Sequence, residues 1–329
     1  MLVLTADETR EHLPFPEMIG AIEKMFKDAC QVPLRHVHSV DTPKGNSTWL
    51  LMPAWQHGGR LGVKVVAIHP HNRQSGLPAL NSTYTLFDAS NGQPLAHLDG
   101  NEITSRRTAA ASALAARFLS RPDADQLLVV GAGRVASLIP DAYRAVREIR
   151  KIRIWDVDPN LAMGLAKSLR ARGMDAEQVD DLEAAVSESD IVSCATLATR
   201  PLIKGEWLRP GMHLDLIGSF TPDMREADDG CFLRSEVYVD TEEAIKKSGD
   251  LLSPIQNGAL QPSRIRATLS ELCRAPGYGR RNSEEITLFK AVGTALEDLA
   301  AASLAYDARL LMLGRRPEAA GMPSLPSTR

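Results

Sequence analysis

The sequence predicts an α/β protein that combines a doubly wound parallel sheet with an α+β region containing an antiparallel sheet. Three observations predict it. After about residue 125, short apolar strands alternate with helical segments, which is typical of a parallel sheet covered by helices. A glycine-rich run at 131–136 lies between one such strand and one such helix. Before residue 100, strand-like runs follow one another, and two are joined through Asn91-Gly92, a hairpin signal.

The length and composition indicate a globular chain of two domains. A domain takes about 100–200 residues, and this chain has 329. Hydrophobic residues make up 44% and charged residues 24%, which is ordinary globular composition. The net charge of −3 gives no general attraction for polyanions, so we expect neither nucleic-acid nor membrane-surface binding.

The N-terminus and the cysteines predict a cytoplasmic protein. The first ten residues carry Asp7 and Glu8 and no apolar core of signal-peptide length, and no run approaches the roughly 20 apolar residues of a spanning helix. The cysteines are far apart and form no CxxC pair, so we expect reduced thiols and no metal site. They are Cys30, Cys194, Cys231 and Cys273.

The elements of the first hundred residues follow from periodicity and turns. Pro16 suits the first turn of a helix at 16–29, in which apolar residues recur at helical spacing. We predict strands at 47–54, 61–68, 82–88 and 93–98. Thr104 is then expected to cap an alanine-rich helix at 105–119, which Pro122 stops.

The rest of the chain predicts the parallel sheet and a closing helix. The expected strands are 126–130, 151–156, 191–195, 213–217, 236–239 and 286–290. The expected helices are 134–148, 159–172 and 294–313, and the last is expected to return and pack on the first domain. The tail at 314–329, rich in Pro, Gly and Ser, is expected to be frayed or disordered.

The run 131–136 reads GAGRVA and predicts a dinucleotide site in a Rossmann-like domain. Gly131 permits the tight turn, and Gly133 lets a pyrophosphate approach the backbone near the N–H groups of the following helix. A glycine turn that binds nothing is the alternative. The expected contacts in this run are Gly131, Ala132, Gly133, Arg134 and Val135.

Asp156 favours NAD(H) over NADP(H). It ends the second strand of the motif, where a carboxylate accepts hydrogen bonds from the ribose hydroxyls and repels a 2′-phosphate. The alternative is that Asp156 caps the helix at Pro159, although Asp158 suits that cap better. Thr196 follows the strand at 191–195, and either contacts the cofactor or is a plain loop threonine.

Three candidate cations lie in apolar or helical surroundings. Lys64 lies within an apolar strand, where it either binds a ligand or faces water on one side of an amphipathic strand. Arg106 and Arg107 lie near the start of the alanine-rich helix, where cations oppose the helix dipole. Either an anion compensates them or they lie on a solvated face.

Several runs together resemble the ornithine cyclodeaminase/mu-crystallin family over roughly residues 35–306. Besides the glycine fingerprint they are 61–64 (LGVK), 76–78 (GLP), 98–110, Pro222 with 225–226, 248–250 (SGD) and 287–298. The resemblance implies a dimer in which the nucleotide domain, 120–299, is inserted into a substrate-binding and dimerisation domain, 1–119 with 300–329. It also implies that Lys64, Arg107 and Arg35 bind the substrate carboxylate. Thr108 and Gly218 complete the expected cofactor contacts.

One departure from the cyclodeaminase pattern concerns the activity. Where the cyclodeaminases carry an Asp that serves in deamination and ring closure, this chain has Phe220, which transfers no proton. The segment is more similar to the imine-reducing branch of the family. Phe220 is then expected to provide an apolar wall for the substrate ring.

The sequence therefore predicts an NAD(P)H-dependent oxidoreductase that reduces small cyclic 2-imino acids to proline or pipecolate. The expected substrates are 1-pyrroline-2-carboxylate and 1-piperideine-2-carboxylate, with Lys64 as candidate proton donor. The alternatives are an ornithine cyclodeaminase with bound NAD, an alanine dehydrogenase-like reductive amination, and a non-catalytic dimer that binds ligand and cofactor.

Overall fold

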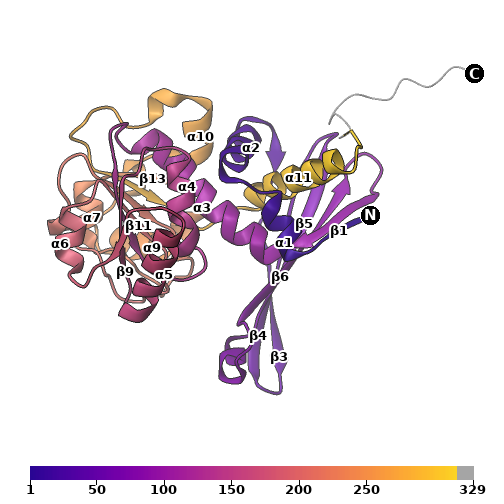
Figure 1. Ribbon diagram of the computed structural model, residues 1–329, viewed down its shortest axis with the longest axis horizontal. Helices are drawn as coiled ribbons and strands as arrows, with labels where there is room; N and C mark the ends of the chain where they lie inside the picture. The colour runs from indigo at the N-terminus through magenta and orange to yellow at the C-terminus, as the bar shows by residue number, and fades with distance from the viewer. Residues whose placement is uncertain (317–329) are drawn as a thin grey trace, which may run out of the picture. The chain divides into compact units, whose positions relative to one another are not determined.

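The computed structural model describes residues 1–316, and the chain divides into two compact units (Figure 1). The first contains Met1–Arg107 and the chain from Ala295 onward, and the second contains Thr108–Thr294. The helix at the first limit therefore passes from one unit into the other. From residue 317 onward, the tail that was expected to be frayed or disordered lies outside the described residues. No helix of the described part is long and apolar enough to cross a membrane.

The second unit contains the predicted parallel sheet. Within the described residues it has eight strands, all parallel, in the order β10-β9-β8-β11-β12-β15-β13-β14. They are β8 (Gln126–Val130), β9 (Lys151–Trp155), β10 (Ala176–Gln178), β11 (Ile191–Cys194), β12 (His213–Leu216), β13 (Glu236–Val239), β14 (Ile265–Thr268) and β15 (Thr287–Lys290). Every residue of β11, β12 and β15 is buried, because helices cover both faces of such a sheet.

The helices of this unit are mostly short. They are α4 (Ile139–Arg144), α5 (Pro159–Ala171), α6 (Leu182–Ser187), α7 (Asp229–Arg234), α8 (Ala244–Lys247), α9 (Gly249–Gln256) and α10 (Leu269–Arg274). The helix predicted at 134–148 was wrong in length, because α4 begins only at Ile139, after a 3-10 turn at Ala136–Leu138. Pro140 has no N–H to donate to the carbonyl of Ala136, so the α-helical ladder starts beside it.

The first unit contains a mixed sheet of seven strands in its described residues. Its order is β1-β7-β6-β5-β4-β2, and β3 pairs with β4. The strands are β1 (Leu2–Leu4), β2 (Cys30–Gln31), β3 (His36–Thr42), β4 (Gly45–Gln56), β5 (Arg60–Ile68), β6 (Leu80–Asp88) and β7 (Pro94–Asp99). The four predicted strands are present as β4 to β7, with the hairpin between β6 and β7. The prediction of an antiparallel sheet was wrong at one edge, since β1 pairs with β7 in parallel.

Two helices pack on each other, and one of them packs on this sheet. They are α2 (Phe15–Lys27) and α11 (Ala295–Met312), and α11 also contacts β4, β5 and β6. The return of the last helix to the first part of the chain is thus confirmed. A short helix that was not predicted, α1 (Ala6–Glu11), precedes them and has a capping box formed by Thr5 and Glu8.

The long helix α3 (Gly100–Leu119) begins before Thr104, so the predicted cap was wrong. Asp99 accepts a hydrogen bond from the backbone N–H of Glu102 at 2.8 Å and occupies the capping position instead. Gly100 makes this early start possible, because a Cβ there would lie 2.6 Å from the backbone carbon of Ser82. Strand β7 therefore runs directly into the helix.

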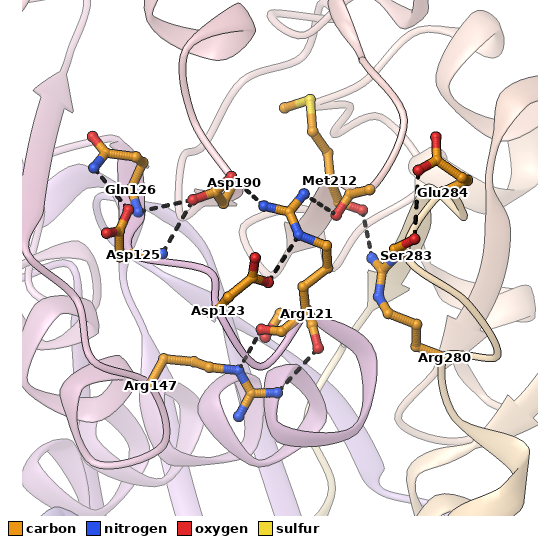
Figure 2. Close-up of polar contacts among 12 residues, drawn as sticks. Arg121, Asp123, Asp125, Gln126, Arg147, Asp190, Met212, Arg280, Ser283 and Glu284 are labelled. Carbon is orange, nitrogen blue, oxygen red and sulfur yellow. Dashed lines mark hydrogen bonds and ion pairs between the residues drawn. The ribbon is translucent and has the colours of Figure 1, made fainter.

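The carboxyl end of α3 lies at the edge of the parallel sheet where its strands begin (Figure 2). The guanidinium of Arg147 donates to the backbone carbonyls of Ala116, Arg117 and Ser120, and that of Arg280 donates to the carbonyl of Leu119. The last carbonyls of a helix lack the backbone N–H partners of its interior, and of those named here the carbonyl of Ala116 also accepts the N–H of Ser120. Arginine side chains thus occupy this edge, and the opposite edge, where the strands end, remains for the candidate site.

Candidate active site

The fingerprint loop follows β8 and has the backbone that a dinucleotide requires. Gly131 has a φ of 109°, and a Cβ there would lie 2.8 Å from the carbonyl oxygen of Ala195. Only glycine fits such a position. No atom lies within 4 Å of the place that a Cβ of Gly133 would take. The backbone is thus open at Gly133 to a pyrophosphate, and the residues fit a bound dinucleotide.

Asp156 lies beside this loop, immediately after β9. Its Oδ2 accepts a hydrogen bond from the N–H of Ala132 at 2.7 Å, and its Oδ1 accepts one from the N–H of Asp158 at 2.9 Å. Asp158 caps α5 through the N–H of Asn160, so the reading of Asp156 as the helix cap was wrong. The half-buried carboxylate of Asp156 lies where a ribose hydroxyl is recognised in this fold.

Thr196 and Gly218 follow the next two strands and are joined by a carboxylate that sequence reasoning did not assign. Glu226 Oε1 accepts from the N–H and Oγ1 of Thr196, both at 2.8 Å, and Oε2 accepts from the N–H of Gly218 at 2.8 Å. A Cβ at Gly218 would lie 2.1 Å from the carbonyl oxygen of Thr196. Burial raises the pKa of Glu226 to about 7, against the charge of Lys290 and the hydrogen bonds from Thr196.

The other residues expected at the cofactor lie on the same unit. Arg134 is exposed and Val135 is half-buried, and both follow the two glycines within the fingerprint. Thr108 lies on α3 and is the first residue of the second unit. Phe220, expected at the substrate ring, also lies on this unit and is 45% exposed.

In the first unit, Lys64 and Arg107 converge on one carboxylate, Asp298. Lys64 Nζ lies 2.8 Å from Asp298 Oδ1, and Arg107 Nε lies 2.9 Å from the same oxygen. Arg107 Nη1 also donates to Glu297 Oε2 at 2.6 Å. Lys64 is 2% and Arg107 6% exposed, so the water-facing reading of either cation was wrong.

Within this cluster the pKa values of both Lys64 and Asp298 are lowered, for different reasons. Burial lowers the pKa of Lys64 to about 8. The charge of Asp298 opposes this shift, and the positive charges of Arg107 and Arg35 add to it. Burial also acts on Asp298, but Lys64 and Arg107 hold the pKa of that carboxyl below its usual value. Arg35 is thus within electrostatic reach of Lys64, and the three predicted cations lie near one another.

Asp298 and Glu297 were missed as site residues, although the run at 287–298 contains them. A signal was present, since two adjacent carboxylates stand among alanines and leucines at the start of a helix. Their partners are 190 residues or more away along the chain, and no local pattern reports such a distance. The wall of the cluster also includes Tyr84, paired across the strands with Lys64 and fully buried.

The fold and the site define a class of protein, a two-unit α/β protein with a Rossmann-type dinucleotide-binding unit. The chain belongs to the ornithine cyclodeaminase/mu-crystallin family, whose model matches residues 1–311.

Three relatives show the range of the family. The chain is 40% identical to the Delta(1)-pyrroline-2-carboxylate reductase of Paracoccus denitrificans, over 85% of this chain and 89% of that protein. The solved structure of Thermococcus litoralis Delta(1)-pyrroline-2-carboxylate reductase, in complex with NADH and L-proline, has a TM-score of 0.89, 34% identity and coverage of 97% and 100%. An archaeal alanine dehydrogenase dimer with bound NAD has a TM-score of 0.87, 28% identity and coverage of 96% and 98%.

Proposed function

We propose that this protein is an NAD(P)H-dependent reductase of small cyclic 2-imino acids, with 1-pyrroline-2-carboxylate and 1-piperideine-2-carboxylate as substrates. The observation that carries the proposal is the buried Lys64, whose pKa of about 8 makes it an acid suited to neutral pH, beside Arg107. The similarity to two Delta(1)-pyrroline-2-carboxylate reductases supports the same activity.

The cation cluster of the first unit would bind the carboxylate of the imino acid. Three cations, Arg35, Lys64 and Arg107, stand near two carboxylates, Glu297 and Asp298. These cations would attract the carboxylate of an imino acid. Arginine suits this role because its planar fork matches a carboxylate. Asp298 orients both Lys64 and Arg107, which lowers the cost of ordering them when the substrate binds.

Lys64 would donate the proton to the imine nitrogen. When bound, the reduced nicotinamide supplies the hydride to the imine carbon. Lys64 supplies the proton and becomes neutral, and solvent returns the proton after the amine leaves. The charge of Arg107 beside Lys64 favours this loss of a proton. Phe220 would offer the ring an apolar surface.

The second unit would bind the cofactor, and Asp156 favours NADH, although NADPH remains a candidate. A carboxylate at the end of β9 accepts from ribose hydroxyls and repels a 2′-phosphate. The proposed contacts are Thr108, Gly131, Ala132, Gly133, Arg134, Val135, Asp156, Thr196 and Gly218.

We further propose a cytoplasmic homodimer in which the nucleotide-binding unit is inserted into the substrate and dimerisation domain. All four cysteines are free, which suits a reducing compartment. Val37, Val40 and Trp49 on β3 and β4 are exposed and apolar, which suits a surface covered by a second copy.

The test is the absorbance of the reduced nicotinamide when purified protein meets 1-pyrroline-2-carboxylate with NADH or NADPH. We expect loss of absorbance that depends on the imine, is faster with NADH and requires no ammonia. In parallel, ornithine with NAD should release no ammonia. Release of ammonia and proline from ornithine without imine reduction would establish a cyclodeaminase. A requirement for ammonia would establish the alanine dehydrogenase-like reaction.

A further inference from the structure

A buried carboxylate joins two loops of the second unit at the edge where the strands end. Glu226 is fully buried, and its two oxygens accept four hydrogen bonds. Two come from Thr196 after β11, and two come from the N–H groups of Gly218 and Ser219 after β12. Both oxygens act only as acceptors, so an ionised carboxylate suits the position and a neutral amide does not.

Asp250 and Lys290 hold Glu226 in place. Asp250 Oδ1 accepts from the backbone N–H of Glu226 at 2.8 Å and of Ala227 at 3.2 Å. Its Oδ2 lies 3.2 Å from Nζ of Lys290, which ends β15 and is 4.0 Å from Glu226 Oε2. All three charged groups are fully buried. The loops after three neighbouring strands are therefore tied together by one charge cluster.

The strand order indicates which part of a bound dinucleotide these loops would face. The sheet runs β9-β8-β11-β12, with the fingerprint after β8 and Asp156 after β9. The loops that Glu226 joins thus lie on the side of the fingerprint away from Asp156. If the pyrophosphate lies at Gly133 and the adenine ribose at Asp156, the other half of the cofactor extends over β11 and β12.

We propose that Glu226 is a positioning residue that holds the loops receiving the nicotinamide half of the cofactor, with Asp250 and Lys290 fixing its place. The proposal rests on the proposed function, because it requires a bound dinucleotide. Glu226 acts through Thr196, Gly218 and Ser219 and touches no reacting atom. It sets the geometry in which the hydride donor is held, and the adenine half is independent of it.

The test compares two ligands on two variants. Glu226→Gln keeps the shape but turns one acceptor into a donor facing other donors. We expect it to weaken NADH binding, measured by nucleotide fluorescence, about tenfold or more, and ADP-ribose binding, measured by calorimetry, less than about twofold. Asp250→Asn, which acts through Glu226, should give the same split at smaller size and serves if the first variant fails to fold.

Asp215 provides the matched control, because it is also a buried carboxylate on the same sheet. The hydrogen bonds that it accepts within residues 1–316 come from the hydroxyls of Ser112, Ser193 and Tyr143. Asp215→Asn should lower the melting temperature but weaken both ligands equally or not at all. Equal weakening of both ligands in Glu226→Gln, or no weakening, overturns the positioning role and leaves the proposed function intact. Wild-type protein that binds neither ligand overturns both.

Discussion

At the scale of single residues, the most informative group is Lys64. A lysine donates a proton only while it is protonated, and burial lowers the pKa of Lys64 to about 8. We therefore expect kcat/KM for the imine to be flat below pH 8 and to fall above it, where the protonated fraction declines. An ordinary lysine would delay this fall by more than two pH units.

Lys64→Arg is the matched control for this pH profile. Arginine keeps the positive charge beside Asp298 but does not lose its proton in this range. We expect kcat to fall by roughly 10² or more, as for loss of a general acid, with binding of the carboxylate largely kept. The fall near pH 8 should disappear. A profile of the same shape in this variant would assign the titration to the substrate and remove Lys64 as donor.

At the scale of elements, the carboxyl end of α3 depends on Arg147 (Figure 2). Its guanidinium donates to five backbone carbonyls, and three of these belong to Ala116, Arg117 and Ser120. Removing it leaves buried carbonyls without partners, each of which costs about 1–3 kcal/mol. We expect Arg147→Met to lower the free energy of unfolding by about 2–4 kcal/mol, measured by urea denaturation.

An exposed arginine nearby provides the comparison. Arg150 has a side chain that is 68% exposed, so Arg150→Met should change the free energy of unfolding by about 0.5 kcal/mol or less. Arg147→Lys should lie between the two, because an ammonium keeps the charge but cannot reach several carbonyls at once. Equal stability of Arg147→Met and Arg150→Met would mean that the helix end needs no side-chain partner.

The elements also differ in how far the sequence predicts them. Strands β8 and β13 begin and end where the sequence predicts, because the residues after Gln126 and Glu236 form short runs that are buried on both faces. The short strands β1 and β2 were not predicted, because three and two residues are too few to show an alternating pattern. Each pairs with a strand that is remote in the sequence. The start of α3 was misplaced because a favourable cap at Thr104 competes with the close approach of Gly100, which only the fold creates.

At the scale of the whole chain, local motifs place the residues proposed for the cofactor more readily than those proposed for the substrate. The fingerprint and Asp156 lie within one β-α-β segment, so spacing alone places them together. Lys64 and Arg107 become a cluster only through Asp298, 234 residues beyond Lys64. Glu226 is similar, because its partners come from loops that follow different strands. Buried charge pairs between remote segments are therefore what the sequence leaves undetermined.

Association of two copies also belongs to the scale of the whole chain, and the first unit has an exposed surface that suits it. Among the described residues, strand β3 pairs only with β4, and Figure 1 shows the two extending together beyond the rest of their sheet. Six of the seven residues of β3 are exposed. An exposed edge strand with apolar residues invites pairing with another chain. Val40 and Trp49 lie on one face of this ribbon, since Trp49 is opposite His38 and side chains alternate.

We therefore expect the double variant Val40→Glu and Trp49→Glu to turn the dimer into a monomer in light scattering coupled to size exclusion. Two buried carboxylates in each copy cost more than an interface of ordinary size returns, so the loss should persist at micromolar protein. Leu161→Glu, on the exposed face of α5 in the other unit, adds one such charge at another exposed apolar position and should leave the proposed dimer intact. A double variant that remains dimeric would move the interface away from β3 and β4, whereas a wild-type monomer would remove the dimer from the proposed function.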